Sequence, residues 1–517
     1  MSTPQASREH ESIRRMRAAR WLVLAGLLAL SQAAAAGLVA LEPVLVEGRV
    51  LMKAEPQGAY KAPVVRPLSG PLGPALAHEA RTGTTTFMLQ LDAAAQRLLG
   101  QEHPQPTFLL VSAEEGGFAR RGFWLMRGAG DPEWHADPYV NLAVDADSLE
   151  DGSFEEIFAH ETGHVLLRRL LPGLPAGYSR VPHSSLAITD YPTAFDEGFA
   201  IHFQALAREL TRNPRLRLED AGFAAKPFVP YWKDALDRTL RIRGVRDSLF
   251  VQRQLPWPAH PLAVSPDATP LFDPGELKNG QQMMASEGVI ATLFYHLLDQ
   301  PSPSTAALRS RYTDLMRTLR AVNASAPDPG TAVFLRLVQE HIRLFPERRS
   351  AWLSTVIGMT YGATVDAHLA RASGELALLG RAGDAEAFAA RLAPARKALT
   401  ECVEAVARDP NRLSAALGPE LWTSAPEASA SGSQQGPTAA DPAPAAVNLN
   451  TAERSSFILW LKLDAGTADR ALASRAAEGP FKDLADFARR AGLTGEREAQ
   501  LRAGAAAILA AGPLARE

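Results

Sequence analysis

The sequence predicts an α+β fold, in which a small N-terminal sheet packs on a mainly helical domain that is followed by a small all-α module. Short apolar runs separated by turn residues occupy the chain before residue 146 and are typical of strands. From 153 to about 410 the apolar residues recur mainly with helical spacing. A Ser/Ala/Pro/Gly-rich stretch at 423–446 then separates a second helical segment from the first.

The composition limits the classes of function that the chain can have. With 517 residues, it has room for two to four domains at roughly 100–200 residues each. A net charge of −3 creates no global field that would recruit nucleic acid or anionic lipid. Cys402 is the single cysteine, so neither an intramolecular disulfide nor a cysteine-based zinc site can form. Any metal must therefore be held by histidines and carboxylates.

Residues 1–36 have the pattern of an export signal. Four arginines between positions 14 and 20 precede the apolar run Trp21–Leu30, and small residues near Ala34–Ala36 suit a signal peptidase. Continued to Leu41, the segment is also long enough for an uncleaved membrane anchor, and a core helix is the third alternative. A signal or an anchor places the body in the periplasm or outside the cell, with membrane contact only if the segment stays uncleaved.

Further along the chain, the expected organisation is as follows. We expect a Pro/Gly-rich, extended or propeptide-like lead-in at 37–80, a main domain at 81–420, a disordered linker at 421–446 and a small helical module at 447–517. Within the main domain, strands are expected at 85–91, 106–113, 122–128 and 139–145.

The stretch SFEEIFAHETGHVLLRRLL (153–171) predicts a well-delimited helix. Ser153 and Glu156 have the spacing of a capping box, and Pro172-Gly173 ends the helical pattern. Within this helix lies the string His160-Glu161-Thr162-Gly163-His164.

Histidines four residues apart project from the same face of a helix. The side chains of His160 and His164 can therefore reach one Zn²⁺ ion, and Glu161 can accept a proton from water beside it. A coincidental H-E-x-x-H string is the alternative.

A catalytic zinc site needs a third protein ligand and an open position. We expect Glu197, in the helical stretch TAFDEGFAIHFQAL (193–206), to be that ligand, with Thr193 as the helix cap. Glu287 is the rival candidate, although it also fits the start of a third helix. Asp196 is a candidate for orienting a ligand histidine. The candidates for a group that stabilises a transition state are Tyr191, His183, His202, Tyr295 and His296.

The H-E-x-x-H string followed by Asp196-Glu197-Gly198-Phe199-Ala200 resembles the two zinc helices of gluzincin metallopeptidases. The resemblance covers about 50 residues (153–206) and implies a zincin-type fold, a Zn²⁺ cofactor and a peptide or protein substrate. It also implies that the stretch YVNLAVD (139–145) is the edge strand that binds substrate backbone. The 32 residues between His164 and Glu197 exceed the family's usual loop, and the G-x-M-E-N motif of aminopeptidases is missing.

Residues 447–494 resemble the helix-hairpin-helix module of competence-type DNA receptors. DNA-binding members use glycine-rich hairpins whose amides contact phosphate. Here those positions carry Lys462-Leu463-Asp464 and Gly492-Leu493-Thr494. The loss of glycines and the charge of Asp464 favour a packing or protein-interaction module, and DNA binding is the alternative.

The sequence therefore predicts an exported zinc metallopeptidase in which His160, His164 and Glu197 hold the metal and Glu161 is the general base. The alternative is an extracytoplasmic DNA- or protein-binding protein with an inactive zinc domain. The module is expected to serve a protein partner in the cell envelope. Because of the linker, truncation near Ala425 is expected to leave the main domain folded.

Overall fold

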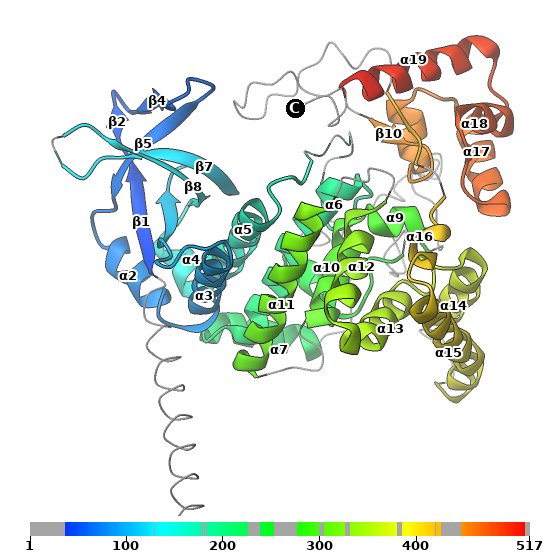
Figure 1. The fold of residues 1–517 in the computed structure, drawn as a ribbon, viewed down its shortest axis with the longest axis horizontal. Coiled ribbons are helices and arrows are strands. Elements are labelled where there is room, and N and C mark those ends of the chain that lie inside the picture. The colour runs from blue at the N-terminus through cyan, green and yellow to red at the C-terminus, as the bar shows by residue number, and fades with distance from the viewer. Residues whose placement is uncertain are drawn as a thin grey trace, which may run out of the picture.

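A computed structural model describes the chain from Gly37 to Ala511. The residues that it leaves undescribed in this range are 129, 176, 178, 180, 182, 226–237, 253–276, 299–303, 326–330, 380–384, 419 and 425–445. The protein is α+β, with 58% helix and a small N-terminal sheet (Figure 1). The expected signal or anchor at 1–36 lies outside the described residues. Among the helices that are described, none has the length and apolar character needed to cross a bilayer.

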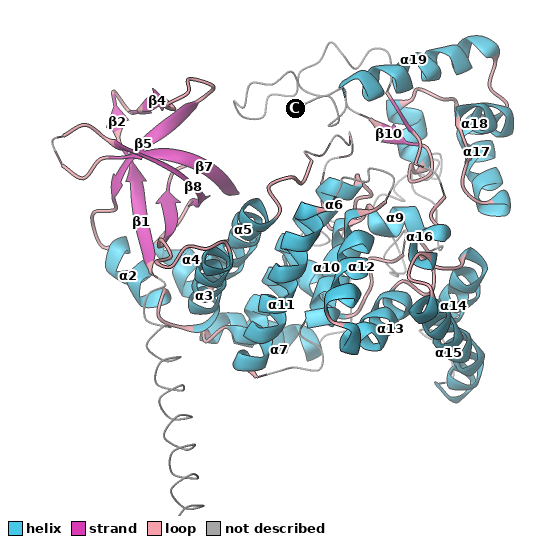
Figure 2. Cartoon of the chain, viewed as in Figure 1, coloured by secondary structure: helices cyan, strands magenta, loops and turns pink. Residues whose placement is uncertain are grey.

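Six of the strands, all from the N-terminal part of the chain, lie together at one end of the molecule (Figure 2). They form one six-stranded sheet in the order β1-β6-β8-β7-β5-β4, and an additional pairing of β1 with β5 closes five of the strands into a ring. Strands β1 and β6 are parallel, as are β6 and β8 and β5 and β7, whereas β7 and β8 are antiparallel. The bounds are β1 Leu38–Pro43, β4 Met52–Ala54, β5 Lys61–Pro67, β6 Thr107–Val111, β7 Gly117–Leu125 and β8 Glu133–Leu142.

Side chains that alternate along each strand build two separate cores, as the two-residue period of a strand requires. In β6, Phe108 and Leu110 join Phe123 and Tyr139 in a cluster formed by the strands alone. Leu109, which points the other way, belongs to the large cluster that includes the neighbouring helices. The sheet is therefore attached to the helical body through one of its faces.

Two of the expectations for the N-terminal region are wrong. The segment 37–80 contributes β1, β4 and β5 to the sheet, so it is part of the fold and not an extended lead-in. Residues 85–91 are not a strand, because they lie in helix α3 (Gly83–Leu98). Their threonine and aromatic content favours a strand locally, but the helix-forming stretch that follows them and burial against α5 override that preference.

The remaining three strand predictions fall on β6, β7 and β8, and the part after 153 is mainly helical, as expected. The other helices of the main body are α2 Leu72–Glu79, α4 Ala146–Asp151, α5 Ser153–Leu170, α6 Tyr191–Leu210, α7 Pro214–Ala225, α8 Arg238–Arg246, α9 Gly280–Met284, α10 Glu287–Leu298, α11 Thr305–Ala324, α12 Val333–Leu344, α13 Arg349–Met359, α14 Ala367–Leu379, α15 Ala385–Arg408 and α16 Arg412–Ala415.

Helices α5, α6 and α10 pack side by side because glycines remove side chains at their crossings. A Cβ atom on Gly163 of α5 would lie 3.0 Å from Cα of Ala200 in α6. A Cβ atom on Gly198 of α6 would lie 2.6 Å from Cβ of Ile290 in α10. Both distances are too short for a larger residue, so the sequence specifies these close approaches.

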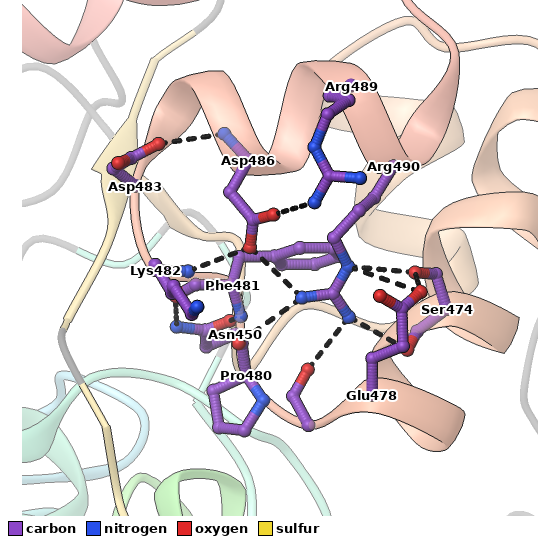
Figure 3. A network of polar contacts seen from close by, with 11 residues as sticks. Asn450, Ser474, Glu478, Pro480, Phe481, Lys482, Asp483, Asp486, Arg489 and Arg490 are labelled. Carbon is purple, nitrogen blue, oxygen red and sulfur yellow. Dashed lines mark hydrogen bonds and ion pairs between the residues drawn. The ribbon is translucent and has the colours of Figure 1, made fainter.

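The C-terminal module has its own hydrophobic core. Its helical elements are a π-helical turn at Ser456–Trp460, α17 Ala465–Glu478, α18 Leu484–Ala491 and α19 Gly495–Ala511. The guanidinium of Arg490 ties them together: it stacks on Phe481, pairs with Asp486 and donates to the carbonyl oxygens of Ser474 and Gly479 (Figure 3). This network therefore joins α17 to α18 and to the turn between them.

The module begins before the expected linker ends. Strand β9 (Trp422–Thr423) pairs with β10 (Val447–Asn448), and the Thr423 hydroxyl donates to the Leu501 carbonyl oxygen at 2.7 Å. Residues 421–424 are thus part of the module and not of a disordered linker, while 425–445 lie outside the described residues.

The module is also docked on the main body. The side-chain amides of Asn279 and Gln282, at the start of α9, donate to the carbonyl oxygens of Asn450 and Thr451 at 3.0 Å each. Arg371 donates to the Ala476 carbonyl oxygen at 2.8 Å.

These contacts change the expectation for truncation near Ala425. A chain that ends at Ser424 loses the partner strand of β9 and the acceptors for two amides of α9, so we expect the free energy of unfolding to fall by about 1–3 kcal/mol. Urea denaturation of the truncated and full-length chains measures this difference. A chain that lacks only residues 512–517 is the control. Equal unfolding midpoints for all three chains would mean that the docking contributes nothing to stability.

Candidate metal centre

Helix α5 begins differently from the expected capping box. Its N-cap residue is Gly152, with a φ of 82°, and no side chain caps the helix. The Glu156 carboxylate is buried and instead pairs with Arg208 of α6. The helix ends at Leu170, before Pro172-Gly173, as predicted. The cap of α6 also differs from the prediction, because the Asp190 side chain accepts from the Thr193 amide.

The structure brings His160, His164 and Glu197 together. The Nε2 atoms of the two histidines are 3.3 Å apart, and Oε2 of Glu197 lies 3.6 Å from His160 Nε2 and 3.7 Å from His164 Nε2. Ligand atoms about 2.1 Å from a tetrahedral Zn²⁺ ion are separated by about 3.4 Å. The three measured separations therefore fit one such ion, and the three groups form a cluster that could hold a metal.

Glu161 lies beside this cluster. It is buried, and its Oε1 atom is 4.0 Å from His160 Nε2. Burial raises the pKa of the Glu161 carboxyl above its usual value, against the opposing effect of the two histidines. Its other neighbour is Gly117 at the start of β7, where a Cβ atom would lie only 2.5 Å from Glu161 Oε1.

Asp196 orients one of the histidines. Its Oδ1 atom is 2.6 Å from His164 Nδ1, so a proton on Nδ1 donated to the carboxylate leaves Nε2 free to bind a metal. Asp196 is therefore in the position proposed for it from the sequence. His160 Nδ1 is buried and has no hydrogen-bond partner among the described residues.

The charges at the cluster favour a cation. Burial lowers the pKa of His164, but the carboxylates of Asp196, Glu197 and Glu161 outweigh burial and raise this pKa to about 9. For Glu197, burial raises the pKa, but the hydrogen bond and charge of His160 and the charge of His164 outweigh it and lower this pKa to about 2. Without metal, a proton on His164 supplies the positive charge that the carboxylates require.

Glu287, the rival third ligand, is not part of this cluster. It is the first residue of α10 and its carboxylate is only 1% exposed. Burial, together with the charge of Glu197, raises the pKa of Glu287 well above its usual value. Its Oε2 atom lies 3.9 Å from Nδ1 of His183, which is also 3.9 Å from Oε2 of Glu197.

Among the candidate transition-state groups, His183 lies next to the metal cluster, with its Nδ1 atom 3.9 Å from Oε2 of Glu197. His202 is buried between the Phe199 carbonyl oxygen and the Tyr312 hydroxyl. The hydroxyl of Tyr295 donates to Glu209, and His296 contacts the Arg246 carbonyl oxygen. Tyr191 is part of the large hydrophobic core.

The prediction that residues 139–145 form the edge strand is wrong. Residues 139–145 belong mainly to β8, which lies between β6 and β7 and has no free edge there. The strand next to Glu161 is β7. Near its end, β7 pairs with β5 at Trp124 and Leu125. Its first part, Gly117–Arg121, pairs with β8 on one side. The sequence analysis did not identify Gly117 as a neighbour of Glu161. The pair Gly116-Gly117 was the available signal, because glycines in a strand often lie where another group approaches the backbone closely.

Comparison with protein-family models, with curated proteins and with solved structures found no match.

In the C-terminal module, Asp464 is the N-cap of α17. Its carboxylate accepts from the Thr467 amide at 2.9 Å and from the Thr467 hydroxyl at 2.7 Å. A phosphate would have to replace this carboxylate in order to reach the helix terminus. The observed contacts therefore weigh against the DNA-binding alternative.

Single substitutions test the ligand set. We expect His160→Ala or His164→Ala to abolish stoichiometric zinc binding, because two remaining ligands hold the ion weakly. Glu197→Ala is expected to weaken binding severely, and Asp196→Ala to weaken it by about 10–100-fold. Elemental analysis of desalted protein measures zinc content. Retention of one zinc ion by both histidine variants would place the site elsewhere.

Zinc affinity should also depend on pH. A zinc ion that binds His164 Nε2 displaces the proton that this residue carries below its pKa of about 9. With one proton released, the apparent association constant is expected to rise about tenfold per pH unit between pH 6.5 and 8.5. Competition with a chelator of known affinity at several pH values measures the slope. A flat profile would show that His164 is not protonated in the metal-free protein.

Proposed function

We propose that the protein is a zinc-dependent metallopeptidase of the gluzincin type that acts outside the cytoplasm. The observation that carries the proposal is the cluster of His160, His164 and Glu197, spaced for one tetrahedral ion, with the Glu161 carboxylate beside it. A metal site that only stabilised the fold would need no carboxylate next to an open coordination position.

Each side chain has a definite task in this proposal. Zinc, when bound, polarises the scissile carbonyl group and lowers the pKa of water. The Glu161 carboxylate accepts the proton of the attacking water and passes it to the leaving amine. Its burial raises its pKa towards the working pH, which suits a group that both takes and gives a proton. Asp196 keeps Nε2 of His164 directed at the metal.

The substrate class that fits is a peptide or protein segment in extended conformation. Along Gly117–Arg121, β7 has β8 on one side, and the start of this stretch lies against Glu161. The Arg168 guanidinium donates to the Ala119 carbonyl oxygen in this stretch, and an extended peptide added to the other side of β7 beside it would bring its backbone to the general base. The absence of a side chain at Gly117 leaves room for Glu161 at this point.

The alternative is a DNA- or protein-binding protein with an inactive zinc domain. The intact Glu161 supports the peptidase, and the occupied helix terminus at Asp464 speaks against phosphate binding. We propose the docked module as a protein-interaction site in the cell envelope.

The decisive variant is Glu161→Gln. It removes the base but keeps the shape of the side chain, so zinc content and thermal stability should stay at the wild-type level. Hydrolysis of a peptide library by the zinc-loaded protein should fall by about 10²–10⁴-fold. Equal turnover in the variant would exclude the mechanism. A wild-type protein that contains zinc but cleaves no peptide would favour the inactive-domain alternative.

A further inference from the structure

A second group of potential ligands adjoins the metal cluster. His183 comes from the loop between α5 and α6, Glu197 from α6, and Glu287 from the first turn of α10. The His183 Nδ1 atom lies 3.9 Å from a carboxylate oxygen of each glutamate. Glu197 thus belongs to both groups.

The Glu287 carboxylate is buried in an unusual way. The residue is 1% exposed, and its Oε1 atom has no hydrogen-bond partner among the described residues. The Ser184 backbone and the charge of Arg241 offset part of the cost of burying this carboxylate, but Oε1 keeps no partner among the described residues. The nearby carboxylate of Glu197 also repels a negative charge on Glu287. A metal ion between the two groups could take the place of the proton that the raised pKa of Glu287 implies, and would remove this repulsion.

The backbone is built to place Glu287 there. Gly198 lets the start of α10 approach α6, because a Cβ atom on it would lie 2.8 Å from the Glu287 carbonyl oxygen. Gly288 lets the α5–α6 loop approach from the other side, since its Cβ atom would lie 2.4 Å from the Ser185 carbonyl oxygen. The Gly288 amide donates to that same oxygen at 3.1 Å, and an isolated bridge joins Ile188 to Ser286.

Two cationic side chains near this turn make hydrogen bonds to other groups. Lys278 donates its ammonium protons to the Phe250 carbonyl oxygen at 2.6 Å and the Ser286 hydroxyl at 2.8 Å. Arg241 exerts an attractive charge on Glu287, but its Nη1 atom donates to the Gln204 side chain at 3.0 Å.

We propose that His183, Glu197 and Glu287 bind a second divalent metal ion, so that the zinc centre of the proposed function is dinuclear with Glu197 shared between the ions. One imidazole and two carboxylates are a donor set that suits zinc or manganese. The separations of 3.9 Å exceed the roughly 3.4 Å of a tetrahedral site at about 2.1 Å. A movement of His183, which is exposed on a loop, would shorten both of these separations.

Titration calorimetry of the full chain, after removal of metal with a chelator, tests this proposal. Zn²⁺ added to the wild type is expected to show two sites, one tight and one weaker. Glu287→Gln, which keeps the shape of the side chain, should show only the tight site, and His183→Ala should weaken the second site at least tenfold. His368→Ala, at an exposed histidine on α14, is the matched control and should behave as the wild type.

A second measurement shows where the weaker ion binds. Ions in a dinuclear centre lie about 3.5–4 Å apart, so two Mn²⁺ ions bound to the wild type should give a spin-coupled electron paramagnetic resonance spectrum. Glu287→Gln should give the spectrum of an isolated ion. Should that variant fail to fold, His183→Ala decides, because its side chain is exposed and outside the core.

The possible failures are distinguishable. If the wild type binds a single zinc ion that His160→Ala removes, the second site does not exist and the peptidase proposal stands. Two sites that persist in both Glu287→Gln and His183→Ala would also overturn the second site. If Glu197 and Glu287 bind a substrate ammonium group and not a metal ion, the titration would show a single zinc site, which also overturns the second site. If the wild type binds no zinc, the proposed function itself fails.

Discussion

The close packing of α5 against α6 is the constraint on which the candidate metal centre depends. His160 and His164 share a face of α5 because of their spacing, but they become a site only when Glu197 arrives from α6. Gly163, inside the H-E-x-x-H string, permits this arrival because any side chain would collide with Ala200 and Phe203. The buried pair of Glu156 and Arg208 fixes the same two helices further along. Substitution of Gly163 would therefore damage the site although it contacts no metal.

Charge, and not only shape, then determines what the site can hold. The carboxylates of Asp196, Glu197 and Glu161 outweigh the effect of burial on His164 and raise its pKa to about 9, so they favour a positive charge at this position. Glu287 adds a further carboxylate on the side of Glu197 that faces His183. A single imidazolium balances only part of this negative charge. The number of carboxyl groups next to the two histidine positions is the common basis of the proposed zinc site and the proposed second ion.

The sequence predicted those parts of the site that depend on local periodicity. The positions of His160, His164 and Glu161 on one helix, and of Asp196 and Glu197 on the next, follow from spacing within each segment. Gly117 beside Glu161 and the pairing of Glu287 with His183 depend on contacts between distant segments, which no local pattern contains. The same limit explains the error at 85–91, where local strand preference lost to burial in α3, and the error at 37–80, where strand pairing determined the structure.

The docked C-terminal module belongs to the same chain of contacts as the metal centre. Asn279 and Gln282 hold Asn450 and Thr451 and also cap α9, the helix that leads within a few residues to Glu287. The α5–α6 loop, which carries His183, meets the module through a bridge between Ser179 and Ala446. A partner that binds the module and strains either contact would act on elements that place Glu287 and His183. Two of the module's contacts with the body, at α9 and at this loop, therefore lie next to the elements that carry Glu287 and His183.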